Sequence, residues 1–257
     1  MMCKKYYPKS IFITGASSGI GRALALEYAT EGLTLHLSGR NTDRLEKTAE
    51  LCQRKGTKVY TYLFDTTDEN ASEKAIHDAQ QKAPIDLLIA NAGVSGGVLG
   101  TEETALSTRQ IMKTNVFGTL NTVLPAIESM KKRGGQIALV ASLAGYRGMG
   151  SCPAYSASKA CVKAFGEALH GQNKYKNLHF TTICPGFIET TLTDKNRFYM
   201  PFLMKADKAA RLIRKRLEKA PALIAFPRIM AFGAWFGGAL PTWLALPLFA
   251  LFPKKEK

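Results

Sequence analysis

Short apolar runs alternate with helix-length segments along most of this chain, and this alternation limits the possible folds more than any other feature. The strand-like runs are residues 10–14, 33–38, 57–63, 85–90, 136–141, 178–184 and 222–225. The helix-length segments are residues 19–30, 41–54, 68–82, 103–133 and 154–174, and the fourth is long enough for two helices. Apolar strands that alternate with helices indicate a parallel sheet covered on both faces. Right-handed crossovers then predict an α/β fold with a doubly wound parallel sheet, the Rossmann fold.

The composition of the chain changes near residue 226. Residues 1–226 carry the alternation without an internal repeat or low-complexity tract, so we predict one nucleotide-binding catalytic domain there. Residues 229–252 are 24 consecutive uncharged residues and contain both tryptophans of the protein. We therefore predict that residues 227–257 form an apolar helical C-terminal tail.

Three interpretations of this tail remain open. Its length would allow it to cross a bilayer, which needs about 20 residues. However, Pro241, Pro247 and three glycines break it into short pieces. Broken helices rich in aromatic residues and bracketed by Arg228 and three terminal lysines suit a segment embedded in the membrane interface. The third interpretation is a tail that packs on its own domain or on a second copy of the chain.

Charge and cysteine content narrow the possible partners. The chain has 35 basic and 20 acidic residues, a formal net charge of +15, which favours anionic partners such as a phosphate cofactor, anionic lipid or an acidic carrier protein. The basic residues are scattered and no nucleic-acid-binding motif is present, so we expect no nucleic-acid partner. Five cysteines without a CxxC pair argue against a disulfide framework or a zinc site, and we expect no metal. The N-terminus lacks a signal-peptide core, so we expect a cytoplasmic protein.

Residues 14–21 read TGASSGIG, directly after the first predicted strand and before the first predicted helix. Glycines in this position allow a tight turn and let backbone N–H groups approach a pyrophosphate, which the helix N-terminus also attracts. The motif predicts a dinucleotide site that includes Gly15, Ser17, Ser18, Gly19, Ile20 and Gly21. The alternative is that these glycines serve only the turn.

The end of the second predicted strand indicates which dinucleotide binds. NAD-binding sheets usually have an acidic residue there, which holds the ribose 2′-hydroxyl. Residues 33–42 contain no acidic residue but do contain Arg40, which could bind a 2′-phosphate with two donors. This favours NADP(H) over NAD(H). The alternative is a solvated arginine at the start of a helix.

Tyr155 and Lys159 lie four residues apart in a predicted helix that begins near Pro153, so they share one helix face. A free tyrosine has a pKa of about 10, and a nearby ammonium lowers that pKa toward values useful in proton transfer. Ser142 follows the predicted strand 136–141 and could hold a carbonyl oxygen, and Asn115 lies in the long helical region before that strand. Taken alone, the Tyr–Lys pair could be a solvated helix face.

Taken together, these features resemble the short-chain dehydrogenase/reductase family over about residues 8–226. TGASSGIG looks like the family's cofactor loop, and Asn115, Ser142, Tyr155 and Lys159 match its catalytic tetrad. Asp65 matches the acid that contacts adenine, and Asn91, Ala92 and Gly93 match the NNAG element with Ala90 in its first place. Pro185 and Gly186, followed by Thr190, match the loop over the nicotinamide.

The resemblance implies a role for each catalytic residue. Tyr155 would be the general acid in reduction and the base in oxidation, and Lys159 would lower its pKa and bind the nicotinamide ribose. Ser142 would position the substrate oxygen, and Asn115 would hold a water that links Lys159 to a proton relay. The tail composition is similar to membrane-associated members of the family, whose lipophilic substrates enter from the bilayer.

Our leading expectation is an NADPH-dependent oxidoreductase acting on the carbonyl or alcohol of a lipophilic substrate, such as a steroid, retinoid or fatty-acyl compound. We expect it to act as a homodimer or homotetramer, peripheral or monotopic on the cytoplasmic face of a membrane. One alternative is a ketoacyl-carrier-protein reductase, which the basic charge of the domain suits. A third interpretation is a cofactor-sensing, membrane-bound binding protein without turnover.

Overall fold

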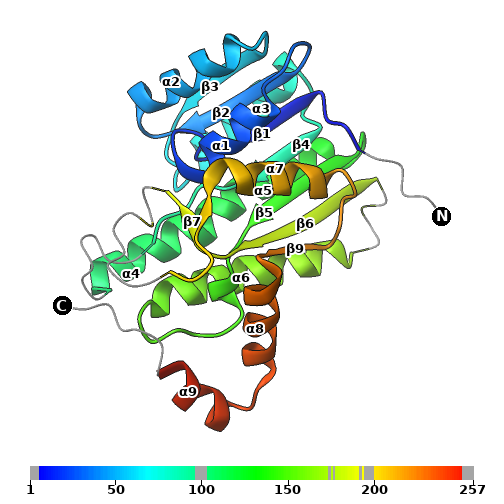
Figure 1. The fold of residues 1–257 in the computed structure, drawn as a ribbon. Coiled ribbons are helices and arrows are strands. Elements are labelled where there is room, and N and C mark those ends of the chain that lie inside the picture. Colours follow the sequence, from blue (N-terminus) through cyan, green and yellow to red (C-terminus); the bar gives the residue numbers. More distant parts are fainter. Residues whose placement is uncertain are drawn as a thin grey trace.

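The computed structural model describes residues 6–95, 103–172, 175, 177–190, 193 and 200–250 of the 257-residue chain. Seven parallel strands form the central sheet, in the order β3-β2-β1-β4-β5-β6-β9 (Figure 1). The strands are β1 Ser10–Ile13, β2 Thr34–Gly39, β3 Lys58–Leu63, β4 Leu87–Ala90, β5 Gly135–Val140, β6 Leu178–Pro185 and β9 Leu223–Phe226. The order reverses between β1 and β4, and this topological switch point is where doubly wound sheets bind their ligands.

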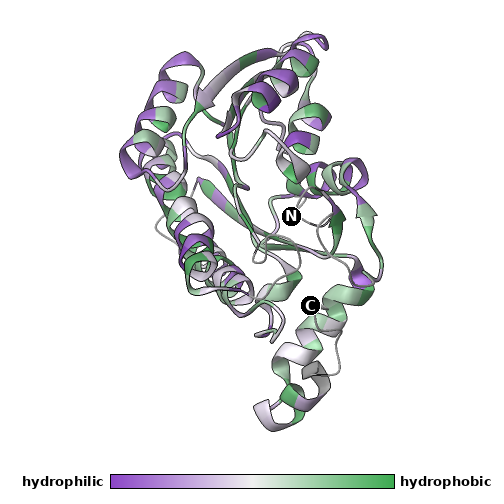
Figure 2. Ribbon diagram, turned by 90° about the vertical axis from the view of Figure 1, so that its left-hand side faces the viewer, coloured by the Kyte–Doolittle hydropathy of each residue, from purple (hydrophilic) through white to green (hydrophobic). Residues whose placement is uncertain are grey.

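Helices cover both faces of this sheet (Figures 1 and 2). One face carries α1 Gly19–Tyr28, α2 Thr42–Gln53 and α7 Ala206–Leu217, and the other carries α3 Glu69–Lys82, α5 Gly118–Met130 and α6 Pro153–His170. Successive residues of β1 point to opposite faces: Ile11 and Ile13 join the first core cluster, and Phe12 joins the second. The doubly wound sheet expected from the alternation is therefore the observed fold, and residues 222–225 mark its last strand to within one residue.

The segment predicted to hold two helices contains three consecutive pieces in the structure. Helix α4 spans Ala105–Met112, a π-helical turn (η2) spans Lys113–Phe117, and α5 follows at once. Pro125 lies inside α5 without ending it. The π-helical turn carries Asn115, and such insertions in helices are frequent at functional sites.

Three elements between residues 187 and 217 were not predicted. A two-stranded parallel sheet pairs β7 Ile188–Glu189 with β8 Met204–Lys205, and α7 follows it. Helix α7 is strongly amphipathic: it buries Ala209, Ala210, Ile213 and Leu217 and exposes its charged side chains. Short strands without a β-rich run leave little trace in a sequence, because their pairing partner is distant along the chain.

The C-terminal segment forms two short helices, α8 Arg228–Ala239 and α9 Thr242–Ala250, separated near Pro241. They extend away from the sheet beside α6 (Figure 1). Within the described residues, none of the helices is long and apolar enough to cross a membrane, so no described helix supports the interpretation of the tail as a membrane span. Helix α8 is also not detached from the domain, since Met230, Ala231 and Ala234 pack against the second core cluster.

Candidate active site

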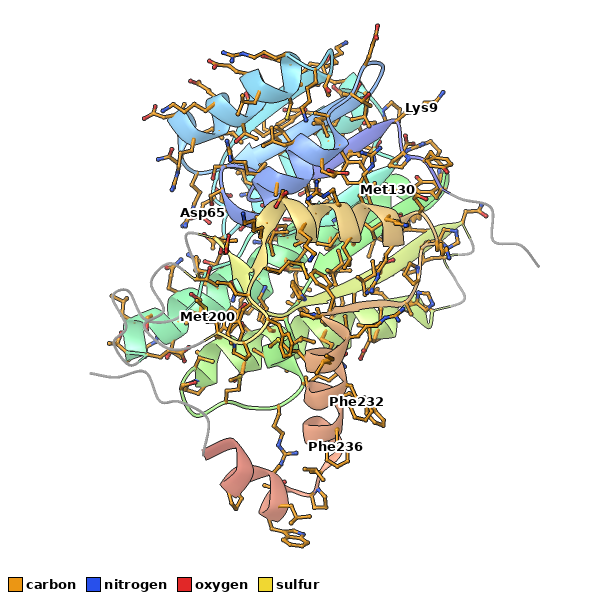
Figure 3. The ribbon with its side chains drawn as sticks, in the orientation of Figure 1. Lys9, Asp65, Met130, Met200, Phe232 and Phe236 are labelled. Atoms are coloured by element: carbon orange, nitrogen blue, oxygen red, sulfur yellow. The ribbon has the colours of Figure 1, made fainter. Side chains whose placement is uncertain are left out.

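The predicted site residues gather at the carboxyl ends of the central strands. The glycine loop follows β1, Arg40 follows β2, Asn91 follows β4, Ser142 follows β5, and Gly186 follows β6. Parallel strands end at one edge, so residues far apart in the sequence converge there (Figure 3, where Asp65 and Met200 are labelled). This edge is where open α/β sheets bind ligands.

Two glycines of the loop have backbone conformations that other residues rarely adopt: Gly15 has φ 67° and Gly19 has φ 55°. A Cβ atom on Gly15 would also lie 3.0 Å from the Cα of Ala92, so the loop is packed closely against the end of β4. Ser18 is the N-cap of α1, and its side chain makes no capping hydrogen bond. The first turn of α1 contains no acidic residue, so the helix N-terminus presents positive potential and unused donors that suit a pyrophosphate.

Thr14 holds the ends of β1 and β4 together, a role that the sequence analysis missed. Its hydroxyl oxygen accepts hydrogen bonds from the backbone N–H groups of Asn91 (2.9 Å) and Ala92 (3.0 Å). The Asn91 side-chain amide donates to the Thr14 carbonyl oxygen at 2.9 Å. Thr14 stands in the TGASSGIG motif, but its partners are 77 and 78 residues away, and only the fold reveals them.

Arg40 and Asp65, which were predicted to bind different parts of the cofactor, form an ion pair with Nη1–Oδ2 at 3.0 Å. Partial burial raises the pKa of Asp65, but hydrogen bonds from Thr67 and Arg40 outweigh it and hold the pKa below its usual value. Neither side chain is buried. The pair therefore leaves the Arg40 guanidinium within reach of an anion at the end of β2.

Asn115 is fully buried, and its side chain makes three hydrogen bonds. Its Nδ2 donates to the Val94 carbonyl and to the Ser158 hydroxyl, both at 2.9 Å, and its Oδ1 accepts from the Val94 N–H at 2.8 Å. The side chain thus ties the segment after β4 to the catalytic helix α6.

Ser142 and Tyr155 are neighbours at the end of β5. Ser142 is the N-cap of a 3₁₀ turn (η3, Leu143–Gly145), where its hydroxyl oxygen accepts from the Ala144 N–H at 3.1 Å. Burial raises the pKa of Tyr155 to about 12, although a hydrogen bond with Ser142 opposes this shift. Tyr155 therefore stays protonated at neutral pH in this structure.

Lys159 is buried on the same face of α6 as Tyr155, one turn further along. Its ammonium donates to the Val140 carbonyl oxygen at 2.9 Å and lies 5.9 Å from the centre of the Tyr155 ring. Burial lowers the pKa of Lys159 to about 8, and Cys184 opposes this shift. Burial dominates the pKa of the phenol, and Lys159 is not among the groups that shift it here; that Lys159 lowers the pKa of Tyr155 stays a prediction.

Glu103 caps the N-terminus of the catalytic helix, and the sequence analysis missed it. Its carboxylate accepts hydrogen bonds from the backbone N–H groups of Ala154 (2.5 Å) and Tyr155 (3.2 Å). A carboxylate at this position satisfies two free donors and complements the helix dipole. Because Glu103 is 51 residues before Ala154, no local capping signal predicts it.

A family model for the short chain dehydrogenases matches residues 9–199, which is most of the chain. This protein is a member of the short-chain dehydrogenase family. An uncharacterized oxidoreductase of Myxococcus xanthus is 36% identical to it over 245 residues, which cover 94% of each chain. Members of this family are NAD(P)-dependent dehydrogenases and reductases, so the chain is an oxidoreductase, and the interpretation as a binding protein without turnover is not supported.

Two further relatives bear on substrate and cofactor. The 3-dehydrosphinganine reductase TSC10B of Arabidopsis thaliana is 34% identical over 187 residues, which cover 71% of this chain and 56% of that protein. The alcohol dehydrogenase of the archaeon Thermococcus sibiricus, solved in complex with 5-hydroxy-NADP, has a TM-score of 0.74 and 26% identity. That comparison covers 85% of this chain and 94% of the archaeal one.

The structure of this short-chain dehydrogenase fits a nicotinamide dinucleotide. The glycine loop lies at the N-terminus of α1, which suits a pyrophosphate. A Cβ atom on Gly19 would lie 3.3 Å from Thr190, so the loop and the segment after β6 are in close proximity. Pro185 ends β6, and the Gly186 N–H donates to the Phe226 carbonyl oxygen at 2.8 Å. Much of the segment 187–205, where the family carries a substrate lid, lies outside the described residues.

Helix α8 of this short-chain dehydrogenase touches both loops of the site. Near its start, Pro227 and the Met230 sulfur would lie 3.1 and 3.3 Å from a Cβ atom on Gly186. Near its end, a Cβ atom on Gly238 would lie 2.8 Å from the Tyr146 carbonyl oxygen, four residues after Ser142. The predicted tail is therefore a neighbour of the catalytic loops as well as an apolar appendage.

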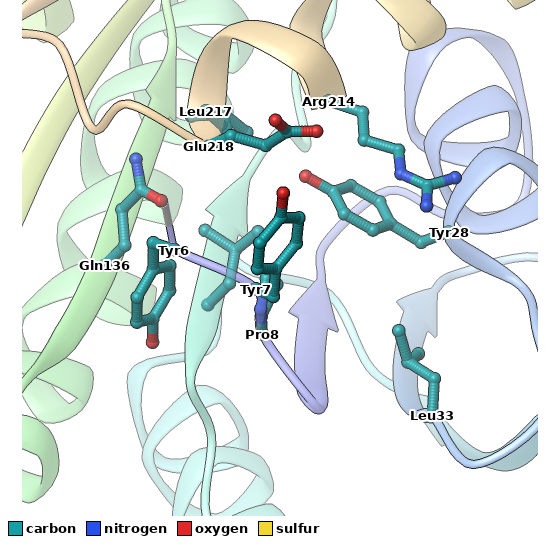
Figure 4. Close-up of a pocket in the computed structure, with 10 residues that line it drawn as sticks. Tyr6, Tyr7, Pro8, Tyr28, Leu33, Gln136, Arg214, Leu217 and Glu218 are labelled. Atoms are coloured by element: carbon teal, nitrogen blue, oxygen red, sulfur yellow. The ribbon is translucent and has the colours of Figure 1, made fainter. Parts of the chain in front are cut away.

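A small cavity of about 50 Å³ lies among Tyr6, Tyr28, Gln136 and Arg214 (Figure 4). It is at the amino ends of the strands, opposite the edge that binds ligands in this fold. The fully buried Gln136 Oε1 has no hydrogen-bond partner among the described residues, so the cavity suits a buried water. No group of three metal-ligating side chains occurs anywhere in the described ranges.

Proposed function

We propose that this enzyme transfers hydride between NADP(H) and the carbonyl or alcohol group of a lipophilic substrate, with Tyr155 as general acid and base. One observation carries the proposal: Ser142, Tyr155 and Lys159 meet at the end of β5, with Asn115 tying α6 to the end of β4. The bound nicotinamide supplies or accepts the hydride, and the protein supplies orientation and protons.

The proposed proton chemistry follows from the two perturbed groups. A phenol with a pKa of about 12 is fully protonated at pH 7 and suits the acid that delivers a proton to the carbonyl oxygen in reduction. Ser142 would donate a hydrogen bond to the same oxygen. With a pKa of about 8, Lys159 is mostly an ammonium at pH 7 and would bind the ribose of the cofactor. Reduction should therefore slow above about pH 8, as Lys159 loses its proton.

Substitution of Tyr155 tests the reaction. Tyr155→Phe should remove nearly all turnover while NADPH affinity stays within a few-fold, because only the transition state needs the proton. The measurement is NADPH oxidation with a panel of steroids, retinoids, fatty aldehydes and ketoacyl thioesters, beside NADPH titration of the same variant. A phenylalanine variant that keeps a tenth of the wild-type rate would overturn the assignment.

The remaining predicted residues would hold the cofactor. Gly15, Ser17, Ser18, Gly19, Ile20 and Gly21 would hold the pyrophosphate. Asp65 would contact the adenine, Asn91, Ala92 and Gly93 would line its site, and Pro185, Gly186 and Thr190 would cover the nicotinamide. Arg40 would bind the 2′-phosphate, and its ion pair with Asp65 supports this by holding the guanidinium at the end of β2.

Arg40→Ala should weaken NADPH binding by about 1.5–3 kcal/mol and NADH binding much less, the scale of a charge-assisted hydrogen bond. Asp65→Asn is the matched control. It removes the carboxylate that holds Arg40 but keeps the guanidinium, so it should affect NADPH less than Arg40→Ala does. Equal losses for NADPH and NADH in the Arg40 variant would mean that Arg40 does not read the phosphate.

The surface of α8 and α9 supports a lipophilic substrate and a membrane surface as partner. Ile229, Phe232, Trp235 and Phe236 on α8 and Trp243 on α9 are exposed, between 52% for Phe236 and 74% for Trp243. Figure 3 shows Phe232 and Phe236 projecting from α8 away from the domain. Exposed apolar patches of this kind mark interaction sites, and the basic residues bracketing the segment would favour an anionic bilayer. We propose peripheral attachment to the cytoplasmic face of a membrane.

Phe232→Asp tests the attachment. In flotation with phosphatidylglycerol vesicles the wild type should rise with the lipid and the variant should not, while both bind NADPH equally. Arg54→Ala, an exposed change at the end of α2, is the control. Wild-type protein that stays with the aqueous fraction in low salt would overturn the membrane proposal and leave the hydride-transfer proposal intact.

One observation favours the second candidate, a ketoacyl-carrier-protein reductase. The exposed side of α7 carries Lys208, Arg211 and Lys215, and Lys219 follows just after the helix; these basic residues would suit an acidic carrier protein. The two candidates differ in salt dependence: kcat/KM for a carrier-bound ketoacyl substrate should fall steeply with salt, whereas kcat/KM for a free lipophilic ketone should not.

We also propose that the enzyme is a homodimer or homotetramer. Phe117 at the end of η2 (57%) and Leu124 on α5 (50%) are exposed, and α6 exposes Cys161 and Ala164. This flat, apolar pair of helices suits burial against a second copy. Leu124→Glu should lower the mass measured by light scattering to that of a monomer, and a wild-type monomer at micromolar concentration would contradict the proposal.

A further inference from the structure

An open cleft of about 590 Å³ lies between the segment after η3, one side of the catalytic helix α6, and the C-terminal helices. Tyr146, Arg147 and Met149 line it from the segment after η3, Ala157 lines it from α6, and Leu246 lines it from α9. Figure 1 shows α8 and α9 extending below α6. A volume of this size can hold a small organic molecule.

The cleft is on the opposite side of α6 from the catalytic pair. Each residue turns an α-helix by about 100°, so Ala157 lies about 200° around the helix from Tyr155. Ala160, which also lines the cleft, lies about 140° from Tyr155, whereas Lys159 lies only about 40° away. A molecule in the cleft would therefore not touch the catalytic side chains.

Among the described residues that line the cleft, Arg147 is the only charged one. Its Nη1 donates to the Leu240 carbonyl oxygen at 3.0 Å and reaches the Gly238 carbonyl oxygen at 3.5 Å, at the C-terminus of α8. In the described part of the chain no carboxylate forms an ion pair with Arg147, and the guanidinium is half-buried. A half-buried cation without a carboxylate favours an anionic ligand group.

The rest of the lining suits a hydrocarbon chain. Met149, Pro153, Ala157, Ala160 and Leu246 present apolar surface, and the glycines at 145, 148 and 150 leave room beside it. Beyond Leu246 the apolar surface continues over the exposed Leu244 and Trp243 of α9. An apolar cleft with one cation is complementary to a molecule that has one anionic group and one hydrocarbon chain.

We propose that this cleft is a second binding site, separate from the active site, for an anionic amphiphile. Its carboxylate or phosphate would pair with Arg147, and its single hydrocarbon chain would lie along α6 and α9. The proposal concerns binding alone and stands whether or not the assigned reaction and its substrate class are right. The amphiphile can come from solution, as a free fatty acid, or from a bilayer, as an anionic lipid.

Dodecanoate below its micellar concentration is a suitable probe for the full-length protein at pH 8. Both tryptophans of the chain, Trp235 and Trp243, lie on α8 and α9, so their fluorescence reports on the two helices that border the cleft. We expect saturable binding of one dodecanoate per chain and binding of dodecanol at least about tenfold weaker, because the neutral head group forms no ion pair with Arg147. Equal affinities for the two probes would overturn the proposal.

Three variants separate charge, shape and folding. Arg147→Gln should weaken dodecanoate at least about tenfold and leave dodecanol unchanged, whereas Arg147→Lys should restore most of the affinity because it keeps the charge. Ala157→Phe should block both probes by filling the cleft. Each variant should bind NADPH like the wild type, and Arg54→Ala should behave like the wild type throughout. An Arg147→Gln protein that binds NADPH and keeps full dodecanoate affinity would overturn the proposal.

Two further measurements identify the source of the amphiphile and the rival occupant. If Arg147→Gln weakens binding to phosphatidylglycerol vesicles but not to phosphatidylcholine vesicles, the amphiphile in the cleft is a membrane lipid. If the protein binds dodecanoate but Arg147→Gln affects both kinds of vesicle equally, the amphiphile is a free acid from solution. If dodecanoate does not bind and Ala157→Phe lowers the mass of a dimer to that of a monomer, the cleft belongs to a second copy of the chain and the proposal fails.

Discussion

Helices α7 and α8 each have twelve residues and lie close together in the chain, yet they differ in which side chains they bury and which they expose. Helix α7 buries Ala209, Ala210, Ile213 and Leu217 against the sheet and points lysines and arginines into water. Helix α8 buries only Gly237 fully and exposes Ile229, Phe232, Trp235 and Phe236. Figure 2 shows the contrast between the hydrophilic stretches of the domain and the apolar C-terminal helices.

The difference separates two ways in which a helix becomes stable. The amphipathic pattern of α7 is satisfied by its own domain, because one apolar stripe meets one sheet face. The pattern of α8 is not, because Met230, Ala231 and Ala234 pack on the domain while the aromatic side chains of the same helix are exposed. A helix that is apolar on most sides needs a second surface, and the proposed lipid partner would supply it.

The strongest test of this comparison places a charge on each helix. Ile213→Asp on α7 should lower the free energy of unfolding by at least about 3 kcal/mol, because it buries an unpaired carboxylate in the core. Phe232→Asp on α8 should change it by less than about 0.5 kcal/mol, because that side chain is in water. Urea denaturation measures both. Similar losses for the two variants would mean that α8 is as much a part of the core as α7.

Truncation tests how far α8 belongs to the domain. A chain ending after Phe226 loses the packing of Met230, Ala231 and Ala234 on the core, and we expect it to be about 1–3 kcal/mol less stable than a chain ending after Leu240. Both should bind NADPH, since the glycine loop and Arg40 lie on other elements. Thermal melts with and without NADPH measure this. Equal stability of the two truncated chains would make α8 a mere appendage.

Substitution of two glycines of α8 by alanine should change the stability of the protein in opposite directions. Gly238→Ala should destabilise the protein by about 1–3 kcal/mol, because the new Cβ would lie 2.8 Å from the Tyr146 carbonyl oxygen. Gly233→Ala should stabilise it by about 0.5–1 kcal/mol, because nothing lies near that position and alanine favours the helix. If both variants are stabilised in thermal melts, α8 does not press against the loop after Ser142.

The smallest effect concerns the outer side of α7. Arg211 pairs with Asp207 at 2.8 Å, one turn apart and both exposed. Arg211→Ala should change the free energy of unfolding by no more than about 0.5 kcal/mol, since water and salt screen such pairs. A loss above 1 kcal/mol in urea denaturation would show that the charged side of α7 also contributes to folding, and would weaken the contrast with α8.

Prediction succeeded where the signal is local and failed where a contact is distant. The alternation of strands and helices predicted the sheet because most of the apolar runs are buried strands, as in Leu87–Ala90. The strands β7 and β8 were not predicted, since two residues carry no periodicity and their pairing depends on the path between them. Thr14 and Glu103 were missed for the same reason: their hydrogen-bond partners are 77 and 51 residues away.

By itself, the sequence determined the class of fold, the position of the glycine loop at a helix N-terminus and the spacing of Tyr155 and Lys159 on one helix face. Each of these follows from interactions between residues close in the chain, which periodicity and glycine content record directly. Tertiary structure decided the rest. It paired Arg40 with Asp65, turned the Lys159 ammonium toward the Val140 carbonyl, and buried Tyr155 so that its pKa rises to about 12. These depend on desolvation and on contacts between distant segments, which exist only once the strands have assembled at one edge of the sheet.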